Sequence, residues 1–156
     1  MEDVLDGIKA YFDASLEATL VAIETARDVT IPRLGGAISL KVDRSKQYPA
    51  MTIYPNNVEY DYGPSDAPRE YDPVITYMVT IVMRHVSSDA EAVQDVLLRY
   101  AEAIVDMRNA DITFGGMANI STVHLGESDF LPIRDAQQEG SLQQSFIQDI
   151  YIIRQG

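Results

Sequence analysis

The chain has 156 residues, and its 24 acidic and 12 basic side chains give a formal net charge of −12. This length favours a single domain, and a surface this acidic would repel the phosphates that tight binding to duplex DNA must neutralise. The absence of cysteine excludes disulfides, thiolate metal ligands and thiol catalysis. No apolar run is long enough for a membrane helix, and the acidic N-terminus does not resemble a signal peptide, so we expect a protein made in the cytosol.

The acidity has two interpretations that charge alone does not separate. Acidic surfaces commonly serve solubility, since like charges keep copies of a protein apart. A second interpretation is a surface that DNA passes without binding to it.

The first predicted element is an amphipathic helix over residues 3–27. Its large apolar residues recur at intervals of three or four and form one stripe: Leu5, Ile8, Phe12, Leu16, Leu20 and Ile23. Arg27 suits the negative end of the helix dipole. The helix should end before Pro32, because a residue that precedes proline avoids helical conformation.

Two short strands are predicted next, at residues 37–42 and 48–54, with a polar turn at 43–47 between them. Basic residues gather around this turn: Arg33, Lys41, Arg44 and Lys46. They form either a solvated turn or a docking edge for an acidic neighbour. Under the second interpretation, Arg33, Arg44 and Lys46 are candidate interface residues.

Residues 55–73 are predicted to form a long loop that is rich in tyrosine, proline and acidic side chains. Loops of this length are uncommon in compact domains and are often functional or disordered. Tyrosine suits interfaces, because it buries a large area at a low cost in conformational entropy. The segment is either a hairpin arm that orders on assembly or a plain mobile loop, and its candidate interface residues are Tyr60, Tyr62 and Tyr71.

The clearest strand in the sequence covers residues 74–85, an unbroken run rich in β-branched residues. The face expected to meet the core carries Ile75, Tyr77, Val79, Ile81, Met83 and His85. The opposite face is mixed and carries Val74, Thr76, Met78, Thr80, Val82 and Arg84. A mixed face is expected where a strand meets solvent, a lumen or a neighbouring subunit.

A second amphipathic helix is predicted from a capping box, with Ser88 as the N-cap and Glu91 as the third helical residue, to about Met107. Its buried stripe is expected to be Val93, Val96, Leu97, Tyr100, Ile104 and Met107.

The last part of the chain predicts a turn at 109–116, a strand at 117–125, a long loop at 126–140 and a strand at 142–154. The loop holds further candidate interface residues, which should either fold back on the core or enter a partner: Phe130, Leu131, Pro132 and Ile133. The last strand is so apolar that it must be paired, either within its own sheet or with another subunit.

The sequence shows no catalytic residues, cofactor motif or metal site. His85 and His124 lie at or near strand ends, and a metal site at either would need ligands from distant elements. Neither the nucleophile motif of hydrolases, the Walker A loop nor the dinucleotide-binding glycine motif occurs. The sequence therefore indicates that this protein is not an enzyme.

The order of elements predicts a single α+β domain, with a mostly antiparallel sheet and both amphipathic helices on one face. In this order and spacing the chain resembles the tail terminator (tail completion) proteins of long-tailed bacteriophages. The likeness lies in the helix exit at 28–32, the strand at 77–82 followed by the helix start at 88–91, the turn at 109–116, and residues 129–132 before the last strand.

The resemblance implies a structural virion protein of the phage neck, made in the host cytoplasm. It would form a homohexameric ring on the head-proximal end of the tail tube, stop tube polymerisation and dock the head-closure or connector protein. DNA would pass through the ring without specific binding, and no cofactor or membrane would be involved. Alternatives are a head-closure, connector-adaptor or tube-like neck protein, or a small acidic enzyme or ligand-binding domain.

Overall fold

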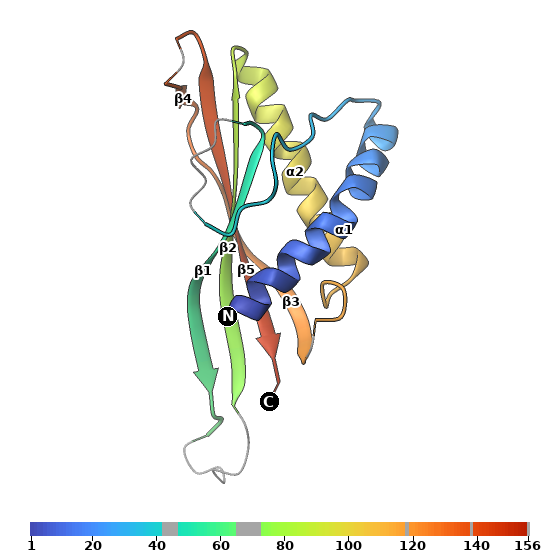
Figure 1. Ribbon diagram of the computed structural model, residues 1–156, viewed down its shortest axis with the longest axis vertical. Coiled ribbons are helices and arrows are strands. Elements are labelled where there is room, and N and C mark those ends of the chain that lie inside the picture. Colours follow the sequence, from blue (N-terminus) through green and yellow to red (C-terminus); the bar gives the residue numbers. More distant parts are fainter. Residues whose placement is uncertain (42–46, 65–72, 118, 138, 156) are drawn as a thin grey trace.

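The computed structural model describes residues 1–41, 47–64, 73–117, 119–137 and 139–155. In this part of the chain, two helices pack on one face of an antiparallel sheet (Figure 1). The elements, in order, are α1 (Glu2–Arg27), β1 (Ala50–Asp61), β2 (Val74–Ser87), α2 (Ala90–Ala110), β3 (Ile120–Phe130), β4 (Arg134–Asp135) and β5 (Leu142–Arg154). The predicted α+β architecture is confirmed.

The strand order in the sheet is β1-β2-β5-β3, with the short β4 also paired to β5. The last strand in sequence is therefore a central strand, and it lies antiparallel to both β2 and β3. It is therefore paired on both sides within its own sheet, which is the first of the two alternatives left open by the sequence.

The core lies between the helices and the sheet. Every residue of the stripes predicted on the two helices is buried. The face of β2 predicted to meet the core does so, with Ile75 and His85 half-buried at its ends and four fully buried residues between them: Tyr77, Val79, Ile81 and Met83. Periodicity alone was enough to identify these surfaces.

The start of α2 differs from the predicted capping box. The N-cap is Asp89, whose Oδ1 accepts a hydrogen bond of 3.0 Å from the backbone N–H of Glu91. The strand β2 continues to Ser87, so Ser88 lies between the two elements and is not the cap. A carboxylate at this position also interacts favourably with the positive end of the helix.

The strand predicted at 37–42 is wrong for the residues that the structure describes. Residues 37–41 touch the sheet through one parallel bridge between Ser39 and Thr52. Ile38 is instead buried in the core beside α1. The segment packs between α1 and the sheet. Burying the side chain of Ile38 there does not require the hydrogen-bonded ladder of a strand. Residues 42–46 lie outside the described part.

Both predicted loops are partly strand. Residues 55–61, expected in the first loop, continue β1 past an irregularity between Pro55 and Asn57. Proline is tolerated there because β1 is an edge strand. Residues 126–130, expected in the second loop, continue β3 past a bulge at Gly126. An added Cβ on Gly126 would overlap the ring of Tyr151, so a glycine lets the bulged strand approach β5 closely.

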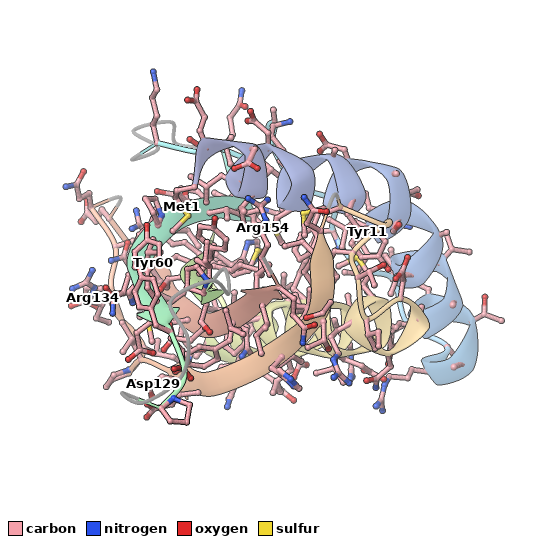
Figure 2. All side chains as sticks on the ribbon, turned by 90° about the horizontal axis from the view of Figure 1, so that it is seen from below. Met1, Tyr11, Tyr60, Asp129, Arg134 and Arg154 are labelled. Atoms are coloured by element: carbon pink, nitrogen blue, oxygen red, sulfur yellow. The ribbon has the colours of Figure 1, made fainter. Side chains whose placement is uncertain are left out.

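The first half of α1 packs against the turn that follows α2. The hydroxyl of Tyr11 donates to the carbonyl of Met107 (2.7 Å), and its ring stacks on Phe114 with the ring centroids 4.9 Å apart. Gly7 lies against the side chain of Met117, where an added Cβ would overlap the sulfur. Figure 2 shows Tyr11 beneath α1, on the side that faces the strands.

Candidate interaction surface

The sheet has a second face that points away from the helices, here called the open face. Its residues alternate with the core residues of each strand. On β2 it carries Thr76, Met78, Thr80, Val82 and Arg84, and on β5 it carries Gln143, Ser145, Ile147, Asp149, Tyr151 and Ile153. Most of these side chains are half-buried by their neighbours in the sheet, and in the described part of the chain no helix covers them.

A chain of hydrogen bonds crosses the centre of the open face. Asn56 Nδ2 donates to Thr80 Oγ1 (3.1 Å), and Thr80 Oγ1 donates to Asp149 Oδ1 (3.0 Å). Thr80 is buried and Asp149 is half-buried. The middle of the open face is thus a polar junction between β1, β2 and β5, with apolar residues above and below it.

The β1–β2 hairpin extends beyond the helices at one end of the molecule (Figure 1). Tyr60 and Tyr62 are 58% and 67% exposed there, beyond the reach of the two described helices. Glu59 and Asp61 pair with residues on the open face of β2 and are also exposed. Tyr71, the third candidate tyrosine, lies outside the described residues.

The candidates Phe130, Leu131, Pro132 and Ile133 lie at the opposite end of the sheet. The ring of Phe130 packs on that of Phe146 with a centroid separation of 4.6 Å. Leu131 is tied to β5 through a backbone hydrogen bond to Ser145 (3.0 Å), yet its side chain remains 38% exposed. Pro132 is exposed and Ile133 half-buried. This segment therefore folds back on the core and also presents an apolar surface.

Arg33 lies elsewhere, against α1. Its guanidinium donates to the carboxylates of Glu17 (2.8 Å) and Glu24 (2.7 Å) and to the carbonyl of Ile31. The hydrogen bond from Arg33 lowers the pKa of Glu24. These bonds hold the segment after α1 in place and use most of the donors of Arg33. Arg44 and Lys46, the other basic candidates, lie outside the described residues.

The structure thus brings Tyr60 and Tyr62 together at one end of the sheet and the 130–133 segment together at the other. Arg33 belongs to neither group. Sequence reasoning did not select Arg134 or Asp149, and it noted Arg84 only as a member of a mixed face. The mixed face of β2 was the feature of the sequence that could have identified this surface. Side chains alternate between the two faces along β2 and β5, so alternation alone assigns each residue of these strands to the core or to the open face.

A pocket of about 220 Å³ lies between α1 and residues 33–38, and Arg33, Glu17 and Tyr100 are among its lining. Neither histidine lines it. His85 is half-buried, and burial lowers its pKa, whereas His124 is exposed on β3. The described residues contain no group of three His, Asp or Glu side chains placed to hold a metal ion. None of the described helices has the length and apolar character needed to cross a membrane.

No protein-family model matches the chain, and a search of curated proteins found no match.

Proposed function

We propose that this protein is a structural subunit that assembles with copies of itself. In the specific form implied by the resemblance, it caps the head-proximal end of a phage tail tube as a ring. The supporting observation is the hairpin that extends beyond the helices, with Tyr60 and Tyr62 more than half exposed. Exposed aromatic groups on a projecting element are typical of surfaces that bind another protein.

The proposed mechanism is steric and involves no turnover. A ring on the tube would present a surface that does not accept further tube subunits, and its other side would dock the head connector. The net charge of −12 supports passage of DNA through such a ring, because phosphates would be repelled rather than bound. Asp149 adds a carboxylate at the centre of the open face.

The experiment that tests the proposal combines light scattering with electron microscopy. A ring of six copies has about six times the 17.4 kDa mass of one chain. Mixing the purified protein with tail tubes should place it at one end of each tube and stop elongation. Tubes that elongate equally well with and without the protein, together with the absence of any ring, would contradict the proposal.

The position within the neck is tested by the exposed side chain of Leu131. Leu131→Asp in the phage should give overlong tails if this end joins the copies of the terminating ring, whereas heads and tails that form but do not join would indicate that this end docks the connector instead. The matched control is Leu98→Asp, since Leu98 is similarly exposed, 41% against 38%, but lies on α2 away from both sheet ends. Circular dichroism of both variants confirms that they fold.

A further inference from the structure

The two ends of the open face carry opposite charges. Glu59 and Asp61 pair with Thr76 and Val74 at the hairpin end. At the other end, Arg84 pairs with Ser145 and Arg134 pairs with Gln143, two positions apart on β5. Because paired residues and residues two apart share a face, all four charged side chains belong to the open face.

Neither arginine forms an ion pair within the described part of the chain. All four charged side chains are exposed, and no ion pair joins either arginine to a carboxylate there. With the amide of Gln143 turned so that its oxygen faces Arg134, the guanidinium donates to this neutral oxygen (2.7 Å). Asp129 shares this face opposite Ile147, without an ion pair to either arginine. Figure 2 shows Arg134 at the rim of the molecule, away from α1.

The acidic and basic ends cannot neutralise each other within one molecule. Thr76 and Arg84 are eight residues apart on β2, which is roughly 27 Å at about 3.4 Å per residue. This exceeds the Debye length of about 8 Å at physiological ionic strength, so the two ends do not attract each other within one chain. Each end is therefore available to the opposite end of another copy.

Face-to-face packing of two open faces would also bring opposite charges together. It is disfavoured by the carboxylate at the centre of the open face. Such packing would enclose the carboxylate of Asp149, which accepts one hydrogen bond among the described residues, from Thr80. Removing a carboxylate from water with so few partners is costly. An end-to-end contact leaves Asp149 in solvent and uses the part of the hairpin that already extends past the helices.

We infer that copies of this chain join end to end, with the hairpin end (Glu59, Asp61 and Tyr62) of one copy against the loop end (Arg84, Arg134 and Leu131) of the next. The inference rests on the proposed self-assembly and names its contact. Tyr62 supplies an aromatic group and Leu131 an apolar one, so charge and apolar character are both matched. A contact between different surfaces closes into a ring or continues as a filament, whereas a contact between identical surfaces stops at a dimer.

Thiol cross-linking tests the contact directly, because the chain has no cysteine of its own. Tyr62→Cys and Leu131→Cys are made separately, one with a tag that gives it a distinct mass, and are mixed with a short bifunctional thiol reagent. The expected product is the mixed dimer, in excess over either homodimer. Ala14→Cys, exposed on α1, replaces each partner in turn as the control. Homodimers alone, or no product above that of the control, would overturn the inference.

Charge reversal gives an independent readout. Glu59→Lys/Asp61→Lys and Arg84→Glu/Arg134→Glu should each weaken self-association about tenfold or more at low salt, because like charges then meet. A one-to-one mixture should associate again with the two variants in alternation, because opposite charges then meet at both kinds of contact between them, and the fourfold variant should self-associate on its own. The matched control is Asp95→Lys/Asp106→Lys on the exposed side of α2. Equal association of all variants would overturn the inference.

The two proposals fail in different ways. Rings that form without any product between positions 62 and 131 would leave the proposed function standing and remove this contact. A cross-link between these positions in chains that never cap a tail tube would establish the contact and remove the proposed function.

Discussion

Arg154, near the end of β5, donates a hydrogen bond of 2.8 Å to the carboxylate of Asp3, in the first turn of α1. The guanidinium also lies 5.2 Å from the centroid of the Tyr77 ring and donates to its hydroxyl. One side chain thus connects the start of the first helix with two central strands.

Replacing Arg154 should therefore destabilise the protein more than replacing its partner. Asp3→Asn should lower the free energy of unfolding by less than about 1 kcal/mol, because Asp3 is largely exposed. Arg154→Gln should cost about 1–2 kcal/mol, because it also loses the contact with Tyr77. Urea denaturation of both variants and the double variant measures this. Equal effects of the two single variants would show that the Tyr77 contact contributes nothing.

The same pair gives a pH dependence. The hydrogen bond from Arg154 lowers the pKa of Asp3 from its ordinary value of 3.8. The folded state therefore favours the carboxylate, so its stabilisation is fully present above this value and is lost as the pH falls from it through the lower pKa of the folded state. The difference in unfolding free energy between wild type and Asp3→Asn should shrink in acid, measured by urea titrations in a pH series.

His85 should give a proton linkage of the same sign, at higher pH. Burial lowers its pKa from the ordinary value of 6.5, and Nδ1 has no hydrogen-bond partner among the described residues. The unfolded chain binds the proton more readily, so stability is full above about pH 6.5 and falls as the pH decreases. His85→Gln should reduce the loss of melting temperature between about pH 7.5 and about pH 5.5. His124→Gln, at an exposed position, is the control and should leave that loss unchanged.

The N-cap of α2 is Asp89 in the structure, whereas the sequence pattern predicts Ser88. Asp89→Ala should destabilise the protein by about 1 kcal/mol, because it leaves the N–H of Glu91 without its acceptor. Ser88→Ala should have little effect, whereas a capping box centred on Ser88 requires the reverse order. Urea denaturation midpoints of the two variants decide between them.

Gly126 should be intolerant of even one added methyl group. Gly126→Ala places a Cβ against the ring of Tyr151 and close to Asp149, so it should cost about 1–3 kcal/mol. Adding Tyr151→Ala should relieve part of this cost, and the double variant will then be more stable than the sum of the single effects predicts. Additive effects in thermal or urea unfolding would place the strain elsewhere. Gly63→Ala is not a suitable control, because Gly63 has a φ of 80° and alanine is strained there for a different reason.

The sequence predicted those elements in which apolar periodicity runs without interruption. The helices and the strands β2 and β5 have long apolar patterns. The predicted faces of the helices and of β2 agree with the structure, and β5 has its predicted bounds. The strand predicted at 48–54 ended too early, because proline usually interrupts a strand. Pro55 lies in β1, which is an edge strand and therefore tolerates proline. Residues 37–41 alternate like a strand, but Ile38 is needed in the core beside α1. The conformations of these two segments depend on neighbours in the tertiary structure, which the spacing of apolar residues along the sequence does not reveal.

The candidate surface was harder to predict than the fold. Tyr60 and Leu131 were selected as candidate interface residues, and the side chains of both are exposed. Their positions at opposite ends of one sheet depend on how β1, β2, β3 and β5 pair, which no local pattern encodes. Arg33 was selected for its charge, but the two carboxylates that bind it come from α1, sixteen and nine residues earlier.

The central position of β5 has a consequence for folding during synthesis. A chain made only as far as residue 141 contains β2 and β3 but lacks the strand that pairs with both. The sheet can therefore not close until residues 142–154 have been made, and until then the apolar edges of β2 and β3 stay open to other chains. A stop codon before this segment would yield an aggregating product rather than a smaller folded domain.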